Sequence, residues 1–349
     1  MSAGFFQWFQ SASCLSQTRS VVLPTAAVSM ERLRIMECLH HMGHRLSRLF
    51  SALLLALLAG SAWAYASETR QQLTFLAAKQ FNECVTGTEV PRLTALQVRN
   101  LVRGNLSEGD RGIARRTVNW QFYDRSNQST PRVLWAIDTR LHARFDELAY
   151  AVLADGVGED LPRFERLGEV VHYLQSVTVP ANTVPIFHPR LWRWNSADAF
   201  TEYPLDREAL ASRLGQVCVE LLATPDTEGL STLLDSTAAV TIANIRAPIA
   251  DMNASWQVFW REGEAGEFGS YGPAGNRFGR ESEFPCRSER CRLLENDPIY
   301  ADFALRQHRL AVVSSMRAML ILQRFRAQRD PTLAQPSWDV SPYRPSGEG

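Results

Sequence analysis

Apolar residues recur at intervals of three and four positions in a series of stretches of this chain. That spacing puts them on one face of an α-helix. The predicted helices cover residues 68–84, 93–103, 136–154, a stretch beginning at Leu167, 207–222, 229–245, 249–261 and 302–325. Asp206 is expected to cap the helix that follows it. Since no convincing run alternates as a strand does, we expect one all-α domain of about eight to ten helices.

Three segments differ from the predicted helices: an N-terminal extension, a long internal segment and the C-terminal tail. The predicted domain covers residues 67–329, and residues 1–41 form an N-terminal extension without a clear pattern. Residues 262–297 are rich in Gly and in charge, and they are too long for an ordinary connection, so we expect a long loop. The tail 330–349 holds four Pro and two Gly and is expected to be disordered.

Residues 42–66 have the pattern of an export signal. A basic segment with Arg45 and Arg48 precedes an apolar run at 49–59, and Ala62-Trp63-Ala64 provides a small-residue cleavage site. The apolar run is short for a membrane-spanning helix. We therefore expect a periplasmic or secreted protein that begins near Tyr65 or Ser67 and has no stable membrane insertion after cleavage.

Four cysteines remain after the predicted signal, and an even number in an exported chain suggests disulfides. Cys286 and Cys291 are close enough in sequence to form a local bridge. That pairing leaves Cys84 and Cys218. They either form a second bridge between two helices or are buried as small apolar side chains.

Charge and motifs narrow the function. The chain has 349 residues, 45% hydrophobic and 21% charged, with a formal net charge of zero. This balance gives no sign of a nucleic-acid-binding patch, which needs a basic excess. The sequence also lacks the serine-hydrolase elbow, the zinc-protease helix motif, the P-loop and the dinucleotide-binding glycine pattern.

Residues 167–182 carry the strongest motif, LGEVVHYLQSVTVPAN. Glu169, His172 and Ser176 lie one helical turn apart, beside the apolar face that starts at Leu167. The stretch resembles the central motif of the zinc-dependent phospholipase C and P1 nuclease superfamily, roughly H-Y-x-x-D-x-x-x-P-x-H. His172, Tyr173 and Pro180 match this motif. Its Asp falls on Ser176 and its second His falls near Asn182.

Further segments follow the family in order. GNLSEGD at 104–110 resembles a G-x-x-x-E-D segment whose Asp bridges two zinc ions, and QFYD at 121–124 resembles H-F-Y-D. A late acidic pair four residues apart and an early His complete the resemblance. The positions that align with these segments are Glu108, Gly109, Asp110, Gln121, Asp198, Glu202 and, for the early His, Arg70 or Gln71.

The resemblance implies an all-α fold and hydrolysis of phosphodiesters or phosphomonoesters through a metal-bound hydroxide. Its candidate metal ligands here are His172, Asp198, Glu202, Glu108 and Asp110. Ligands are replaced at Gln121, Ser176, Asn182 and Gly109, so zinc is the implied cofactor but its site is eroded.

The other histidines add little to this site. Only His172 matches a ligand position among the four that follow the signal. We expect His142 to be a surface or cap residue and His308 to be structural. His188 lies in a predicted loop from which it could reach the site.

Three kinds of site, and two functions, stay open from the sequence. In a vacated or single-metal site, Ser176, Asn182 and Gln121 would bond to one another and to His172. A second possibility is the site of an active multizinc hydrolase. In the third, oxygen donors would hold Ca²⁺ or Mg²⁺. The chain is then either a phosphoester hydrolase with residual activity, acting on a small phosphoester, or a non-catalytic periplasmic module that binds or scaffolds an unknown protein partner. Whether it is an enzyme remains undecided at this point.

Overall fold

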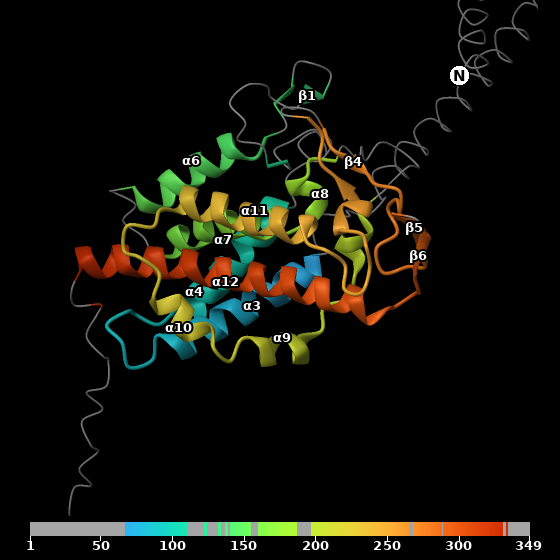
Figure 1. Cartoon of the computed structure of the whole chain (residues 1–349). Coiled ribbons are helices and arrows are strands. Elements are labelled where there is room, and N and C mark those ends of the chain that lie inside the picture. Colours follow the sequence, from blue (N-terminus) through green and yellow to red (C-terminus); the bar gives the residue numbers. More distant parts are fainter. Residues whose placement is uncertain are drawn as a thin grey trace, which may run out of the picture. The chain divides into compact units, whose positions relative to one another are not determined.

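The structure is a computed structural model (Figure 1). Its described residues all belong to the second of two units, residues 61–349. Described are residues 67–109, 122–123, 132–133, 137–138, 140–154, 160–186, 197–264, 268–287, 289–330 and 333. The extension 1–41, the signal-peptide prediction and nearly all of the predicted tail lie outside these residues. None of the described helices has the length and apolar character needed to cross a membrane.

Helices dominate the described residues, as the apolar spacing predicts. The longer helices are α3 (Ser67–Cys84), α4 (Ala95–Gly109), α6 (His142–Leu153), α7 (Asp160–Ser176), α11 (Leu230–Arg246) and α12 (Pro298–Arg329). The shorter ones are α8 (Pro180–Thr183), α9 (Arg207–Arg213), α10 (Val217–Leu222), η1 (Ala199–Glu202) and η2 (Trp256–Val258). The mainly α-helical class is therefore confirmed.

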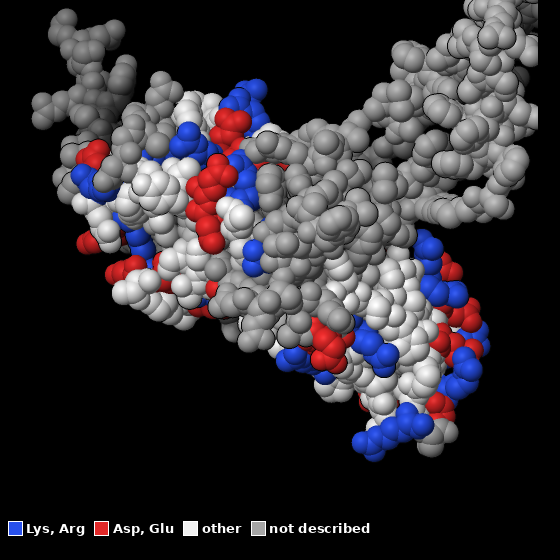
Figure 2. All heavy atoms as spheres, turned by 90° about the horizontal axis from the view of Figure 1, so that it is seen from above, with Lys and Arg blue, Asp and Glu red and all other residues white. Residues whose placement is uncertain are grey.

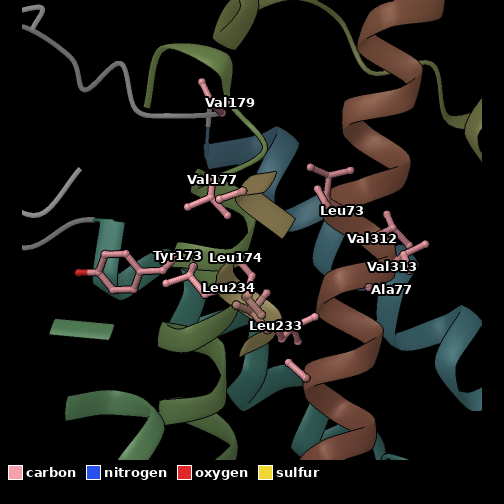
Figure 3. Packing of buried hydrophobic residues seen from close by; sticks show 14 of the residues in the cluster. Leu73, Ala77, Tyr173, Leu174, Val177, Val179, Leu233, Leu234, Val312 and Val313 are labelled. Atoms are coloured by element: carbon pink, nitrogen blue, oxygen red, sulfur yellow. The ribbon is translucent and has the colours of Figure 1, made fainter. Parts of the chain in front are cut away.

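The core forms around α7 and α12. α7 packs against α4, α6 and α12, while α12 also contacts α3, α9, α10 and α11. Figure 3 shows side chains from α3, α7, α11 and α12 meeting in this interior. The predicted apolar face of α7 is fully buried, with Leu167, Val170, Val171 and Leu174 each 0% exposed. Such a stripe drives packing because burial removes apolar surface from water.

Two glycines let α4 and α7 approach unusually closely. A Cβ atom on Gly104 would lie 1.8 Å from the carbonyl oxygen of Glu165, and one on Gly168 would lie 2.0 Å from that of Leu101. Any side chain at these positions would collide with the main chain of the neighbouring helix. This close crossing brings the end of α4 next to the central motif on α7.

Several helix boundaries differ from the predictions. Asp206 caps α9 as expected, because its Oδ1 accepts a hydrogen bond from the Ala209 amide at 2.9 Å. The predicted helix 207–222 is two helices, α9 and α10, interrupted at Gly215, a residue of low helix propensity. The predicted helix 136–154 begins only at His142, since Ile137–Asp138 forms strand β2, paired with β1 (Arg132–Val133).

The prediction of a helix over 249–261 was wrong. Ile249 donates its amide to the Ala254 carbonyl across a turn, and Asp251 has a left-handed φ of 59° within that turn. Asp, Asn and Ser side chains favour such turns. The apolar spacing that suggested a helix comes from Trp256 and Trp260, which are 1% exposed in an aromatic cluster.

The segment 262–297 is more ordered than the long loop we predicted. Strand β4 (Ser270–Tyr271) pairs with β3 (Trp260–Arg261), and β5 (Ser282–Cys286) forms an antiparallel hairpin with β6 (Glu289–Leu293). Alternate residues of β5 are buried, with Phe284 at its centre. Five residues are too few for this alternation to be recognised from the sequence.

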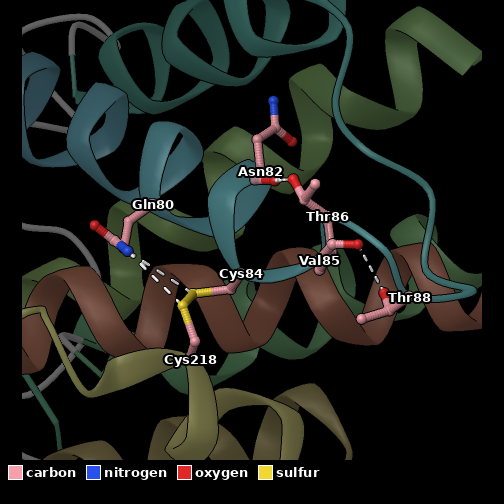
Figure 4. Close-up of a disulfide and its surroundings, with 7 residues drawn as sticks. All are labelled: Gln80, Asn82, Cys84, Val85, Thr86, Thr88 and Cys218. Atoms are coloured by element: carbon pink, nitrogen blue, oxygen red, sulfur yellow. Dashed lines mark hydrogen bonds between the residues drawn. A yellow bond between two sulfur atoms is a disulfide. The ribbon is translucent and has the colours of Figure 1, made fainter.

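Two disulfides are present, and the second decides between the alternatives left open for Cys84 and Cys218. Cys286 and Cys291 close the β5–β6 hairpin with an S–S distance of 2.08 Å, which confirms the local pairing. Cys84, at the end of α3, is bonded to Cys218 on α10 at 2.03 Å (Figure 4). The second bridge joins residues 134 positions apart in sequence and ties α10 to the first helix of the core.

Candidate functional site

Four positions lie together where α4 and α7 cross. In the sequence they belong to three separate segments that resemble the phospholipase C and P1 nuclease family. These positions are Arg70 in the first turn of α3, Glu108 and Gly109 at the end of α4, and His172 on α7. Arg70 contacts the ring of His172, and Gly109 lies against both side chains. Glu108 contacts Tyr173, the neighbour of His172 in the sequence. We call this group the α3–α4–α7 site.

The imidazole of His172 is held by protein groups on one edge. Its Nδ1 lies 3.2 Å from Nη1 of Arg70 and 3.1 Å from the main-chain oxygen of Asn105. A guanidinium only donates and a carbonyl only accepts. Nδ1 therefore accepts from Arg70 when the ring proton is on Nε2, and donates to Asn105 when the proton is on Nδ1. It is engaged in both tautomers.

Gly109 lies against the same edge of the imidazole. A Cβ atom added to Gly109 would be 2.8 Å from Nη1 of Arg70, 3.4 Å from Cε1 of His172 and 3.7 Å from Nδ1. The guanidinium thus fills the space into which a side chain at position 109 would project. Arg70 itself is 2% exposed, so this cation is buried with the histidine.

Glu108 belongs to a second charged group beside this site. Its Oε1 accepts a hydrogen bond of 2.8 Å from the Tyr173 hydroxyl and lies 3.4 Å from Nε of Arg144 on α6. Arg144 also contacts Glu147 at 2.8 Å and Glu169 at 3.6 Å. Burial lowers the pKa of Arg144, but Glu147 and Glu108 outweigh burial and raise the pKa above its usual value. Oε1 of Glu108 is thus engaged by protein groups, the Tyr173 hydroxyl and a guanidinium that it shares with two other carboxylates.

Ser176 and Asn182 are linked to His172 through main-chain carbonyls and not through its ring. The Ser176 hydroxyl donates to the His172 carbonyl at 2.8 Å, one turn earlier in the helix. The Asn182 amide donates to the Ser176 carbonyl at 3.1 Å. Both side chains therefore bond to main-chain carbonyls in the last turn of α7. Neither makes the hydrogen bonds of Nδ1 of His172 described above. Gln121 lies outside the described residues, as do Asp110 and His188.

The predicted acidic pair Asp198 and Glu202 is divided between two environments. Asp198 is buried, where its Oδ1 accepts from the Phe200 amide at 3.0 Å and its Oδ2 accepts from Nε1 of Trp260 at 2.9 Å. Burial raises the pKa of Asp198 to about 6, and these two hydrogen bonds oppose that rise. Glu202 is exposed and lies 3.8 Å from Arg280. Asp198 thus caps η1 inside the aromatic cluster.

A buried polar layer beneath the α3–α4–α7 site was not predicted. The Asn105 amide donates to the Thr74 hydroxyl at 2.8 Å and to Oε1 of Gln175 at 3.0 Å, and the Gln175 amide donates to Thr74 at 3.1 Å. Gln175 also reaches Ser315 on α12 at 3.5 Å. Gln175 follows Leu174, a residue of the apolar stripe. A polar residue at this place is the sequence feature from which the buried polar layer could have been predicted.

The remaining described histidines lie in the interior. His142 begins α6 and is 8% exposed, with its ring 5.0 Å from that of Tyr123, so it is a helix-start residue but not a surface one. His308 packs beside Phe200 in the core, in line with the predicted structural role. Burial lowers the pKa of His308 to about 4.

The described donor set does not fit the zinc site that the resemblance implies. Zinc favours imidazole and thiolate ligands. Position 172 is the single aligned position with an imidazole, and a buried guanidinium faces that ring. Within the described ranges, no three His, Cys, Asp or Glu side chains are arranged to hold a metal ion.

Two surface grooves lie away from this site. One, of about 330 Å³, runs between α6 and the start of α11 and is lined by Asp146, Tyr150 and Leu230 among others. The other, of about 530 Å³, lies along α11 near Ile242 and Arg246. On the face shown in Figure 2, acidic and basic side chains of the described residues are interspersed.

Comparisons of the chain with models of protein families, with curated proteins and with solved structures found no match.

Proposed function

We propose that this chain is an exported protein built on a scaffold like that of the zinc-dependent phospholipase C and P1 nuclease superfamily, and that it acts as a non-catalytic binding or scaffold module. In this proposal the residues at the old ligand positions stabilise the fold, and the protein neither holds zinc nor hydrolyses phosphoesters.

The observation that carries this proposal is that protein groups already engage the candidate ligands. Glu108 is held by Tyr173 and Arg144, and Asp198 is held by Trp260 and a main-chain amide. A carboxylate that serves as a buried cap or ion-pair partner already has protein donors on its oxygens, and a metal ion would have to compete with them. Removing one partner of a buried pair is costly.

The loss of neutral imidazoles supports the same conclusion. Hydrolysis of the implied kind uses a metal to generate hydroxide and to stabilise charge at phosphorus. The α3–α4–α7 site has one histidine, and its Nδ1 is engaged by Arg70 or by the Asn105 carbonyl. No side chain in the arrangement replaces the metal as a source of hydroxide.

Two disulfides support the export part of the proposal. Such bonds persist in oxidising compartments such as the periplasm and are rare in the cytosol. The predicted Cys286–Cys291 bond and a second bond between Cys84 and Cys218 are both formed.

Hydrolysis assays test the proposal. The exported protein and its His172→Ala variant are incubated with bis(p-nitrophenyl) phosphate and p-nitrophenyl phosphate, with added zinc and with a chelator. We expect both proteins to give equal, background rates in each of the four combinations of substrate and additive. Binding of p-nitrophenyl phosphate in the chelator, detected as a rise in the midpoint of thermal unfolding, would identify a small phosphoester as the ligand of the module. Zinc-dependent turnover that His172→Ala removes would overturn the proposal.

A further inference from the structure

We propose that the Arg70 guanidinium is the resident cation of the α3–α4–α7 site and that it excludes a metal ion from Nδ1 of His172, the ring nitrogen on the side of Gly109. This inference rests on the proposed function and deepens it, since it names the group that keeps the site free of metal.

The guanidinium occupies the position that a metal shared by residues 109 and 172 would need. Nη1 of Arg70 is 3.2 Å from Nδ1 of His172, and Nδ1 is the ring nitrogen nearer to a Cβ atom built on Gly109. A ring nitrogen has one lone pair, which goes either to a proton or to a metal. Here Nδ1 either accepts from Arg70 or carries its own proton, so in both states Nδ1 itself has no lone pair for an ion beside position 109.

Charge adds to this steric exclusion. A guanidinium stays protonated at all ordinary pH values and cannot give up its charge as a lysine can. A divalent ion at hydrogen-bond distance from it would be repelled strongly, because both are buried in a region of low dielectric constant. Because its charge is permanent, a buried arginine can replace a metal ion stably, since either cation satisfies nearby lone pairs.

Arg70 and Gly109 are complementary. A Cβ atom at position 109 would approach Nη1 to 2.8 Å, so the present place of the guanidinium depends on glycine there. In the sequence, Gly109 in place of the bridging Asp and Arg70 in place of the early His are two separate differences from the family motif. The structure shows that the two positions are in contact, and one arginine fills both spaces.

The guanidinium is held in place by the packing of α3. Leu73 and Ala77, one and two turns later on the helix, are 0% exposed, and Thr74 donates to the Arg70 carbonyl at 2.8 Å. Thr74 in turn belongs to the buried polar layer with Asn105 and Gln175. The start of α3 is therefore fixed against α4 and α7.

Zinc titration of paired variants tests the inference. Gly109→Asp supplies a carboxylate at the bridging position but leaves the arginine, so we expect an Asp–Arg ion pair and no gain of zinc affinity over the parent. Arg70→Gln combined with Gly109→Asp removes the cation and adds no imidazole. We expect this double variant to bind zinc about ten-fold more tightly, or better, than Gly109→Asp alone.

The matched control is Arg207→Gln in the Gly109→Asp background. Arg207 is an exposed arginine whose Nε donates to Gln72 of α3 at 3.0 Å, so it shares the charge and the neighbouring helix but not the site. We expect no change of zinc affinity in this control. If circular dichroism shows that the Arg70→Gln double variant is unfolded, Arg70→Met with Gly109→Asp replaces it in the same comparison, since it too removes the cation and adds no imidazole.

Equal zinc affinity of Gly109→Asp and of the variant that also lacks Arg70 would overturn the inference, whether both bind tightly or neither binds. That result would leave the proposed function standing if the parent remained inactive toward phosphoesters. Zinc-dependent hydrolysis by the parent would instead contradict the proposed function, so the two failures are distinguishable.

Discussion

Removal of the Cys84–Cys218 bridge should destabilise the protein much more than removal of the Cys286–Cys291 bridge. The first bridge joins α3 to α10 across 134 residues of sequence, whereas the second closes a hairpin whose cysteines are 5 residues apart. A disulfide stabilises a fold mainly because it restricts the unfolded chain, and the restriction grows with the length of the closed loop.

The loop lengths give the magnitude. The chain-entropy relation predicts about 5 kcal/mol for a loop of the first length and about 2 kcal/mol for the second, a difference of about 3 kcal/mol. Both figures are upper values because residual structure in the unfolded chain reduces them. The order of the two losses is expected to survive that correction.

Urea unfolding followed by circular dichroism measures the effect. The oxidised parent is compared with Cys84→Ala/Cys218→Ala and with Cys286→Ala/Cys291→Ala under the same buffer and temperature. The second double variant is the internal control, since it also loses two cysteines and one bridge. An equal or larger loss in the hairpin variant would refute the loop-entropy argument for this fold.

Three further variants test packing, hydrogen bonding and pH dependence. Gly168→Ala should lower the free energy of unfolding by about 3 kcal/mol or more because its Cβ would lie 2.0 Å from the Leu101 carbonyl oxygen. Tyr173→Phe should cost about 1–3 kcal/mol because buried Glu108 loses its 2.8 Å hydrogen bond. His308→Gln should flatten the loss of stability in acid. The pKa of this histidine falls from 6.5 to about 4 on folding, so stability is complete above pH 6.5 and falls by about 3 kcal/mol as the pH drops through this window.

Each of these predictions has a control or a contradicting result in urea unfolding. Gly215→Ala should be nearly neutral, because the nearest atom to its Cβ is 3.6 Å away, and a loss equal to that of Gly168→Ala would refute the close-crossing argument. Tyr150→Phe, at a residue 78% exposed, is the control for Tyr173→Phe. An acid profile identical in the parent and in His308→Gln would contradict the pKa argument.

Much of the helical architecture could be predicted because apolar spacing reports burial directly. The stripe from Leu167 to Leu174 faces the core, and Asp206 caps a helix as its position implies. The pairing of Cys286 with Cys291 also followed from sequence distance. Each of these features depends on residues that are neighbours in the chain.

Features that depend on distant residues were missed. Trp256 and Trp260 look like a helical stripe, yet they are buried by an aromatic cluster that includes Phe303 on α12. Likewise the sequence could align position 70 and position 109 with ligand positions, but it could not show that an arginine at one fills the space left at the other. Both features depend on contacts between different helices or loops, and the spacing of residues within one segment carries no information on such contacts.

Elemental analysis of the protein, purified from the compartment to which it is exported and without a chelator, tests the central claim most directly. Parent and His172→Ala are measured together, with circular dichroism to show that both are folded. The account predicts the same zinc content in both proteins, well below one ion per chain. One or more zinc ions per chain in the parent, lost in His172→Ala, would contradict it.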